Sequence, residues 1–167
     1  MSTTEQARRV TELRESPACE SHDDAHRRAA LAVLADAHVD EIERGLQAVE
    51  PVDHVELRAA ETGLVMLRGR IGGDGDPFSL GEATVTRSAV QIASGEVGFG
   101  YVLGRDQKKA RLCAVCDALW QIKTYREAVE RNVLASVRAR LETERARQRA
   151  QTAATKVDFL TLVRGED

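Results

Sequence analysis

The sequence predicts an α+β protein with N-terminal helices, a four-stranded antiparallel sheet, and long C-terminal helices that end in a docking tail. Two observations predict this fold class. Apolar side chains recur at helical spacing before Pro51 and after Asp106, and between these two positions they alternate with polar ones. At 167 residues the chain is long enough for one ordinary domain with its own core.

The N-terminal part divides into a leader and two helices. Residues 1–20 are predicted to be a flexible charged leader, because Ser16-Pro17 interrupts any helix there. The α+β core domain, residues 21–132, then opens with helices over residues 23–37 and 39–49. The second helix has one apolar face, which consists of Val39, Ile42, Leu46 and Val49.

Four strands are expected next, at residues 55–59, 65–71, 81–93 and 97–103. A turn at residues 60–63 separates the first two, and Ser94-Gly95 separates the last two. The loop between the middle strands, GGDGDP, contains glycines that a phosphate cradle would also use. Phosphate loops normally open a helix with Lys or Ser/Thr following, whereas aspartates and Pro77 follow here, so a hairpin loop is favoured.

A long helical region follows the predicted N-cap Asp106, with a break expected near Asn132. Its predicted core stripe is Leu112, Val115, Leu119 and Ile122. The C-terminal segment, residues 133–167, has an apolar seam that ends at Leu141, so its helix should lie exposed or pack on another chain. The apolar end at residues 157–163 is predicted to dock on a protein surface.

Composition excludes some classes of protein. The net charge of −3 and the pI of 5.9 argue against general nucleic-acid binding. No apolar run approaches the roughly 18 residues that a membrane span needs, and residues 1–20 lack an apolar signal core. We therefore expect a cytoplasmic protein with no nucleic-acid or membrane partner.

Cys113 and Cys116 form a CxxC pair, which is compatible with a zinc or redox site. The chain has no second CxxC, and the third cysteine, Cys19, lies in the leader. A redox pair normally sits at a helix N-terminus, whereas these two fall in mid-helix on a face continued by Trp120. Packing in the core is the favoured interpretation.

Arginines are the remaining candidates for a functional role. Arg68 and Arg70 share a strand face, and Arg87 interrupts an apolar face, where it needs a partner such as Glu61, Asp117, another subunit or a phosphate oxygen. Together with Arg105 they are candidates for contact with an anion or a subunit. The sequence presents no catalytic grouping, nucleotide fingerprint or metal-ligand set, so no catalytic or metal residue is predicted.

Several motifs resemble one family, the G subunit (PhnG family) of the bacterial carbon–phosphorus lyase system. They appear in the expected order and cover roughly residues 25–120 and 155–165. The motifs are RAAETG at 58–63, RIGG at 70–73, GEATVTR at 81–87, YVLGRD at 101–106, DAL at 117–119 and VDFLTLVRG at 157–165.

The resemblance implies a function that spacing alone does not. In that system the G, H, I and J subunits form a core complex, and the I-type subunit, helped by G, H and L, displaces adenine from ATP with methylphosphonate. The product is α-D-ribose 1-methylphosphonate 5-triphosphate. By resemblance, this chain is an accessory subunit that is not active alone and binds no cofactor itself, while ATP is a substrate of the complex. Its expected partners are the H, I and J types, chiefly the I-type catalytic subunit.

Two other interpretations of the sequence stay open at this point. One is a stand-alone module that binds a small anion or phosphate through the four arginines. The other is a zinc or redox protein built on Cys113 and Cys116.

Overall fold

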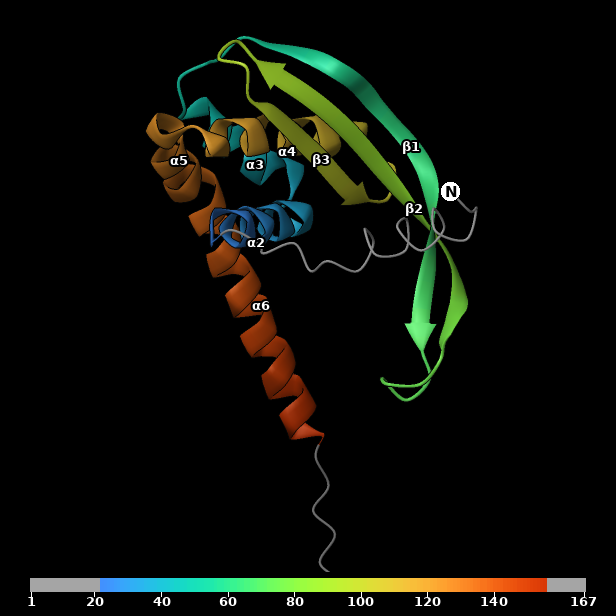
Figure 1. Ribbon diagram of the computed structural model, residues 1–167. Helices are drawn as coiled ribbons and strands as arrows, with labels where there is room; N and C mark the ends of the chain where they lie inside the picture. Colours follow the sequence, from blue (N-terminus) through green and yellow to red (C-terminus); the bar gives the residue numbers. More distant parts are fainter. Residues whose placement is uncertain (1–21, 156–167) are drawn as a thin grey trace, which may run out of the picture.

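The structure is a computed structural model that describes residues 22–155. Figure 1 shows a curved sheet with helices against one of its faces. The predicted leader and the apolar docking tail at residues 157–163 lie outside the described residues. The elements in chain order are α2 (His22–Asp36), α3 (Val39–Gln47), β1 (His54–Arg70), β2 (Pro77–Ile92), β3 (Val97–Leu103), α4 (Gln107–Gln121), α5 (Lys123–Val129), the π-helical segment η1 (Glu130–Leu134) and α6 (Ala135–Ala154).

The described sheet is antiparallel and has three strands in the order β1-β2-β3, so the α+β class is confirmed. The prediction of four strands was wrong. The two strands expected at residues 55–59 and 65–71 are parts of the single strand β1, because the expected turn between them pairs with β2 instead. Thr62 and Gly63 lie opposite Thr86 and Val85. The chain does not turn there. Instead, the pairing of β1 with β2 shifts register twice, between Glu56 and Arg58 and between Arg58 and Glu61.

β1 and β2 extend well beyond the third strand. β3 pairs with β2 only between Val85 and Gln91, so residues 64–84 form a two-stranded ribbon, here called the arm. The glycine-rich segment closes the arm as the predicted hairpin loop, with Gly72 and Gly73 at φ of 65° and 96°. In Figure 1 the arm and α6 both extend below the layer of helices.

Helix α4 lies directly on the backbone of β3. A Cβ atom on Gly98 would overlap the backbone of Ala114 and Ala118, and one on Gly100 would overlap the carbonyl of Ala110. Only small side chains fit between a helix and a strand at such a separation. The buried face of α4 is accordingly made of Ala110, Cys113, Ala114, Cys116, Asp117, Ala118, Leu119 and Trp120.

This contact corrects the predicted core stripe of α4. Of the four residues expected there, Leu119 is buried, whereas Leu112, Val115 and Ile122 are only partly buried. The large side chains lie to the sides because only alanines occupy the positions where α4 meets the glycines of β3.

The helical region after Asp106 begins as predicted and breaks earlier than predicted. The Asp106 side chain accepts a hydrogen bond from the Lys109 backbone N–H at 2.8 Å, which confirms the N-cap. The chain leaves the helical conformation at Ile122, where ψ is 123°. Asn132, where the break was expected, lies inside η1, which joins α5 to α6 as a π-helical turn.

The core lies between α4 and the other helices and under the β3-paired half of the sheet. Its largest fully buried apolar side chains are Leu34, Ile42, Leu134, Val90, Val102, Val129, Val133 and Val137. Two buried hydroxyl groups on the same sheet face are satisfied: Thr86 donates to the Gly104 carbonyl at 2.7 Å, and Ser88 donates to the Arg58 carbonyl at 3.2 Å.

Replacement of Gly100 tests the contact between α4 and β3. We expect Gly100→Ala to lower the free energy of unfolding by more than about 2 kcal/mol, because the added methyl group meets the Ala110 backbone. Chemical denaturation followed by circular dichroism measures the change. The matched control is Gly63→Ala in β1, where no atom lies within 4 Å of the added carbon and no such loss is expected. Equal stability of Gly100→Ala and the wild type would contradict the contact.

Candidate functional surface

Arg68 and Arg70 lie near the tip of the arm. They pair with Ser79 and Pro77 of β2, respectively, and both are exposed. Arg70 donates a hydrogen bond to the Gly75 carbonyl at 3.2 Å, a contact within the hairpin loop. Alternation along β1 places both arginines on the same face as Met66, as the sequence predicted.

Arg87 has the internal partner that the sequence suggested. Its Nε lies 2.8 Å from Oε1 of Glu61, and the same oxygen accepts a hydrogen bond from Arg58 at 3.1 Å. About half of the Arg87 side chain is exposed (56%), so this ion pair is open to solvent and is not enclosed in the core. Arg87 faces away from the helices, on the open side of the sheet with its β3 neighbour Tyr101.

Arg105 lies in the exposed loop between β3 and α4, so the four predicted arginines do not converge on one point. Arg68 pairs with Ser79, which is eight residues from Arg87 along β2, or about 26 Å at the usual rise per residue. This spread does not support a single anion site built from all four. Their role in contact with an anion or a subunit stays a prediction for each arginine separately.

An ion pair that sequence reasoning missed joins α2, α4 and β3. Arg27 binds both carboxylate oxygens of Asp117, with Nε to Oδ1 at 2.8 Å and Nη2 to Oδ2 at 2.7 Å. Asp117 also accepts the Phe99 backbone N–H at 2.8 Å. The Asp117 side chain is 1% exposed, and its hydrogen bonds raise the pKa of Arg27 above the ordinary value.

The same ion pair occupies part of the free edge of the sheet. Even-numbered residues of β3 bond to β2, so Val97 and Phe99 direct their backbone groups away from β2. Arg27 and Gln121 both donate to the Val97 carbonyl, at 3.4 Å and 2.8 Å, respectively. Side chains thus satisfy backbone groups to which another strand would otherwise bind. The spacing of charges along the chain did not reveal this pair, because its partners are 90 residues apart.

A second bidentate pair attaches α6 to the N-terminal helices. Arg140 binds both carboxylate oxygens of Glu41, at 2.8 Å and 3.0 Å, and also donates to the Asp36 carbonyl. Hydrogen bonds from Arg140 hold the pKa of Glu41 below its ordinary value. Beyond Leu141 all the described residues of α6 are exposed, as the thin apolar seam predicted.

The two cysteines of the CxxC pair are free thiols in the core, which confirms the packing prediction. Burial raises the pKa of the Cys113 thiol to about 12 and that of Cys116 well above its ordinary value. Thiolates are the form that binds metals and attacks disulfides, so this environment opposes the zinc and redox interpretations.

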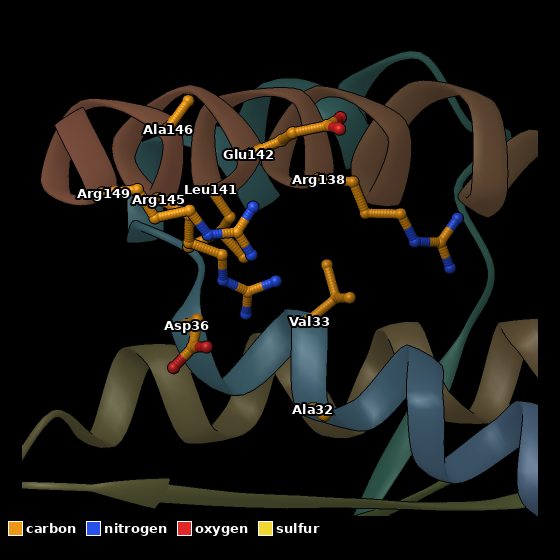
Figure 2. Close-up of a pocket in the computed structure, with 9 residues that line it drawn as sticks. All are labelled: Ala32, Val33, Asp36, Arg138, Leu141, Glu142, Arg145, Ala146 and Arg149. Atoms are coloured by element: carbon orange, nitrogen blue, oxygen red, sulfur yellow. The ribbon is translucent and has the colours of Figure 1, made fainter. Parts of the chain in front are cut away.

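A groove of about 400 Å³ lies between α2 and α6. In Figure 2 the guanidinium groups of Arg145 and Arg149 extend from α6 toward α2 and Asp36, with Val33 on the opposite wall. Acidic and basic side chains both line this groove, since Glu142 and Arg138 lie in it together with Asp36 and the two arginines. The i, i+4 spacing of Arg145 and Arg149 is the sequence signal that would have placed them on one face.

The fold and these surfaces define a class of protein: an α+β domain with a projecting hairpin arm, a projecting helix, and buried ion pairs that join its layers. Within residues 22–155, no helix is long and apolar enough to cross a membrane.

Comparison with known proteins identifies the family. The chain matches the family of the phosphonate metabolism protein PhnG over residues 25–165. It is also 49% identical over 144 residues to the α-D-ribose 1-methylphosphonate 5-triphosphate synthase subunit PhnG of Rhizobium meliloti (strain 1021), a match that covers 86% of this chain and 92% of that relative. The chain therefore belongs to the PhnG family, and the resemblance stated from its motifs is confirmed.

The Arg27–Asp117 ion pair is tested by removal of the arginine. We expect Arg27→Ala to lower the free energy of unfolding by about 3 kcal/mol, because it leaves a buried carboxylate without its cation. Arg87→Ala is the matched control, since that pair is about half exposed on both sides and should cost at most about 1 kcal/mol. Equal losses in the two variants, measured by urea denaturation, would contradict a special role for the buried pair.

Proposed function

We propose that this chain is an accessory subunit of an α-D-ribose 1-methylphosphonate 5-triphosphate synthase, the carbon–phosphorus lyase core complex of organic phosphonate degradation. The observation that carries the proposal is the match to the R. meliloti subunit, which extends over nearly the full length of both chains. In this role the chain works in the cytoplasm beside H-, I- and J-type subunits. The reaction displaces adenine from ATP with methylphosphonate.

The chemistry of the described side chains supports an accessory role. Four groups that acid–base or nucleophilic catalysis could use are engaged in structure: Asp117 and Glu41 bind arginines, and the Cys113 and Cys116 thiols lie in the core. The I-type subunit is the proposed catalyst and the chief partner of this chain. ATP is a substrate of the assembled complex, and this chain holds no cofactor of its own.

The proposal predicts an activity that needs more than this chain. The purified chain should release no adenine from ATP and methylphosphonate, whereas a complex that contains the I-type subunit should release it. Adenine is measured by chromatography over time, with the I-type subunit alone as the reference.

Co-purification is the companion measurement. A tagged chain co-expressed with the neighbouring subunits of its own host should recover the I-type subunit. Robust turnover by the purified chain alone, or failure to recover any synthase subunit, would overturn the proposal.

A further inference from the structure

Large apolar side chains are exposed on the sheet and nowhere else in the described part of the chain. Eleven such residues leave 40–75% of their surface exposed, and all of them lie between residues 55 and 103. The arm alone contributes Leu64, Met66, Leu67, Ile71, Phe78 and Leu80. At about 100 Å² for each side chain, the arm exposes on the order of 600 Å² of apolar surface, divided between its two faces. Contiguous apolar patches of a few hundred Å² on a monomer are often functional.

These side chains occupy both faces of the arm. Alternation along β1 places Leu64 and Met66 on one face and Leu67 on the other. Phe78 pairs with Gly69, and its ring carbons lie 3.2 Å from where a Gly69 Cβ would be, so Phe78 shares the face of Leu67. A flat partner surface would cover only one of these faces. A groove that receives the arm covers both.

The arm has little support of its own. An isolated two-stranded ribbon is at best marginally stable in water, and β3 and α4 cover only the other half of the sheet. A partner that encloses the arm would therefore supply the packing that the helices supply elsewhere.

Two cations on the arm lack carboxylate partners. Among residues 22–155, no carboxylate lies within ion-pair distance of Arg68 or Arg70, whereas Arg58, Arg87 and Arg111 on or beside the sheet each have one. Both unpaired arginines share the face of Met66. The complementary surface is thus apolar with carboxylates at its edge.

We propose that the arm, residues 64–84, binds in an apolar groove of the I-type subunit of the same synthase, with carboxylates of that subunit opposite Arg68 and Arg70. This inference rests on the proposed function and adds the surface that performs it.

The test is a binding measurement on variants of the full chain co-expressed with the I-type subunit. Met66→Lys combined with Phe78→Lys places a charge on each face of the arm and should weaken binding by about 100-fold or more. The matched control adds the same charges at two exposed alanines of α2, Ala25→Lys with Ala29→Lys, and should bind as the wild type does.

If the substitutions at Met66 and Phe78 disturb folding, a second pair of variants tests whether the arm binds the partner. Arg68→Glu with Arg70→Glu changes only exposed side chains and should weaken binding by at least about 10-fold, whereas Arg68→Lys with Arg70→Lys keeps the charge and should retain most of the affinity. Thermal unfolding of each free chain confirms that the fold is intact.

The possible results distinguish failure of the proposed arm contact from failure of the proposed subunit function. If the wild type binds synthase subunits and both arm variants bind equally well, the inference is overturned and the proposed function stands. If the wild type binds no synthase subunit, the function itself fails. A wild-type chain that forms a dimer through the arm would also overturn the inference, because the groove would then belong to a second copy.

Discussion

The structure depends on the close contact between α4 and the backbone of β3. Gly98 and Gly100 permit this approach, and the alanines of α4 fill the space that remains. Asp117 then fixes the helix on the strand, because it binds the Phe99 backbone and Arg27 of α2 together. One glycine-lined contact and one ion pair thus unite three elements that are distant in sequence.

This arrangement determines what stays exposed. With Gly98, Gly100 and Val102 at its inward positions, β3 directs Phe99, Tyr101 and Leu103 outward, where they are 53–75% exposed. Because β3 pairs with only seven residues of β2, α4 covers half of the long hairpin and leaves the arm bare. The exposed apolar surface is therefore a consequence of how the core is built. Exposed apolar surface of this extent is typical of sites that contact other proteins.

The sequence predicted the features that depend on local pattern. The starts of α2, α3 and α4, the β3 bounds, the Asp106 cap and the hairpin loop follow from periodicity and from capping or turn residues. Predictions from the sequence were wrong where tertiary contacts override local propensity. Residues 60–63 look like a turn but are held extended by pairing with β2, and Leu112 and Val115 look like core but are displaced by the alanines at the β3 contact. For the candidate surface, strand alternation indicated that Arg87 needs a partner, and Glu61 was one of the partners that the sequence left open. The Arg27–Asp117 pair was missed, because no sequence period connects α2 to α4.

The central claim is that the helices stabilise one half of the sheet and leave the arm to be stabilised by a partner. Hydrogen–deuterium exchange of the chain, alone and in complex with the other synthase subunits, tests it most directly. In the free chain, amides of residues 64–84 should exchange far faster than those of β3 and α4. In the complex the arm should slow markedly, while β3 and α4 stay as protected as before. Slow exchange of the arm in the free chain, or unchanged exchange of the arm in the complex, would contradict the claim.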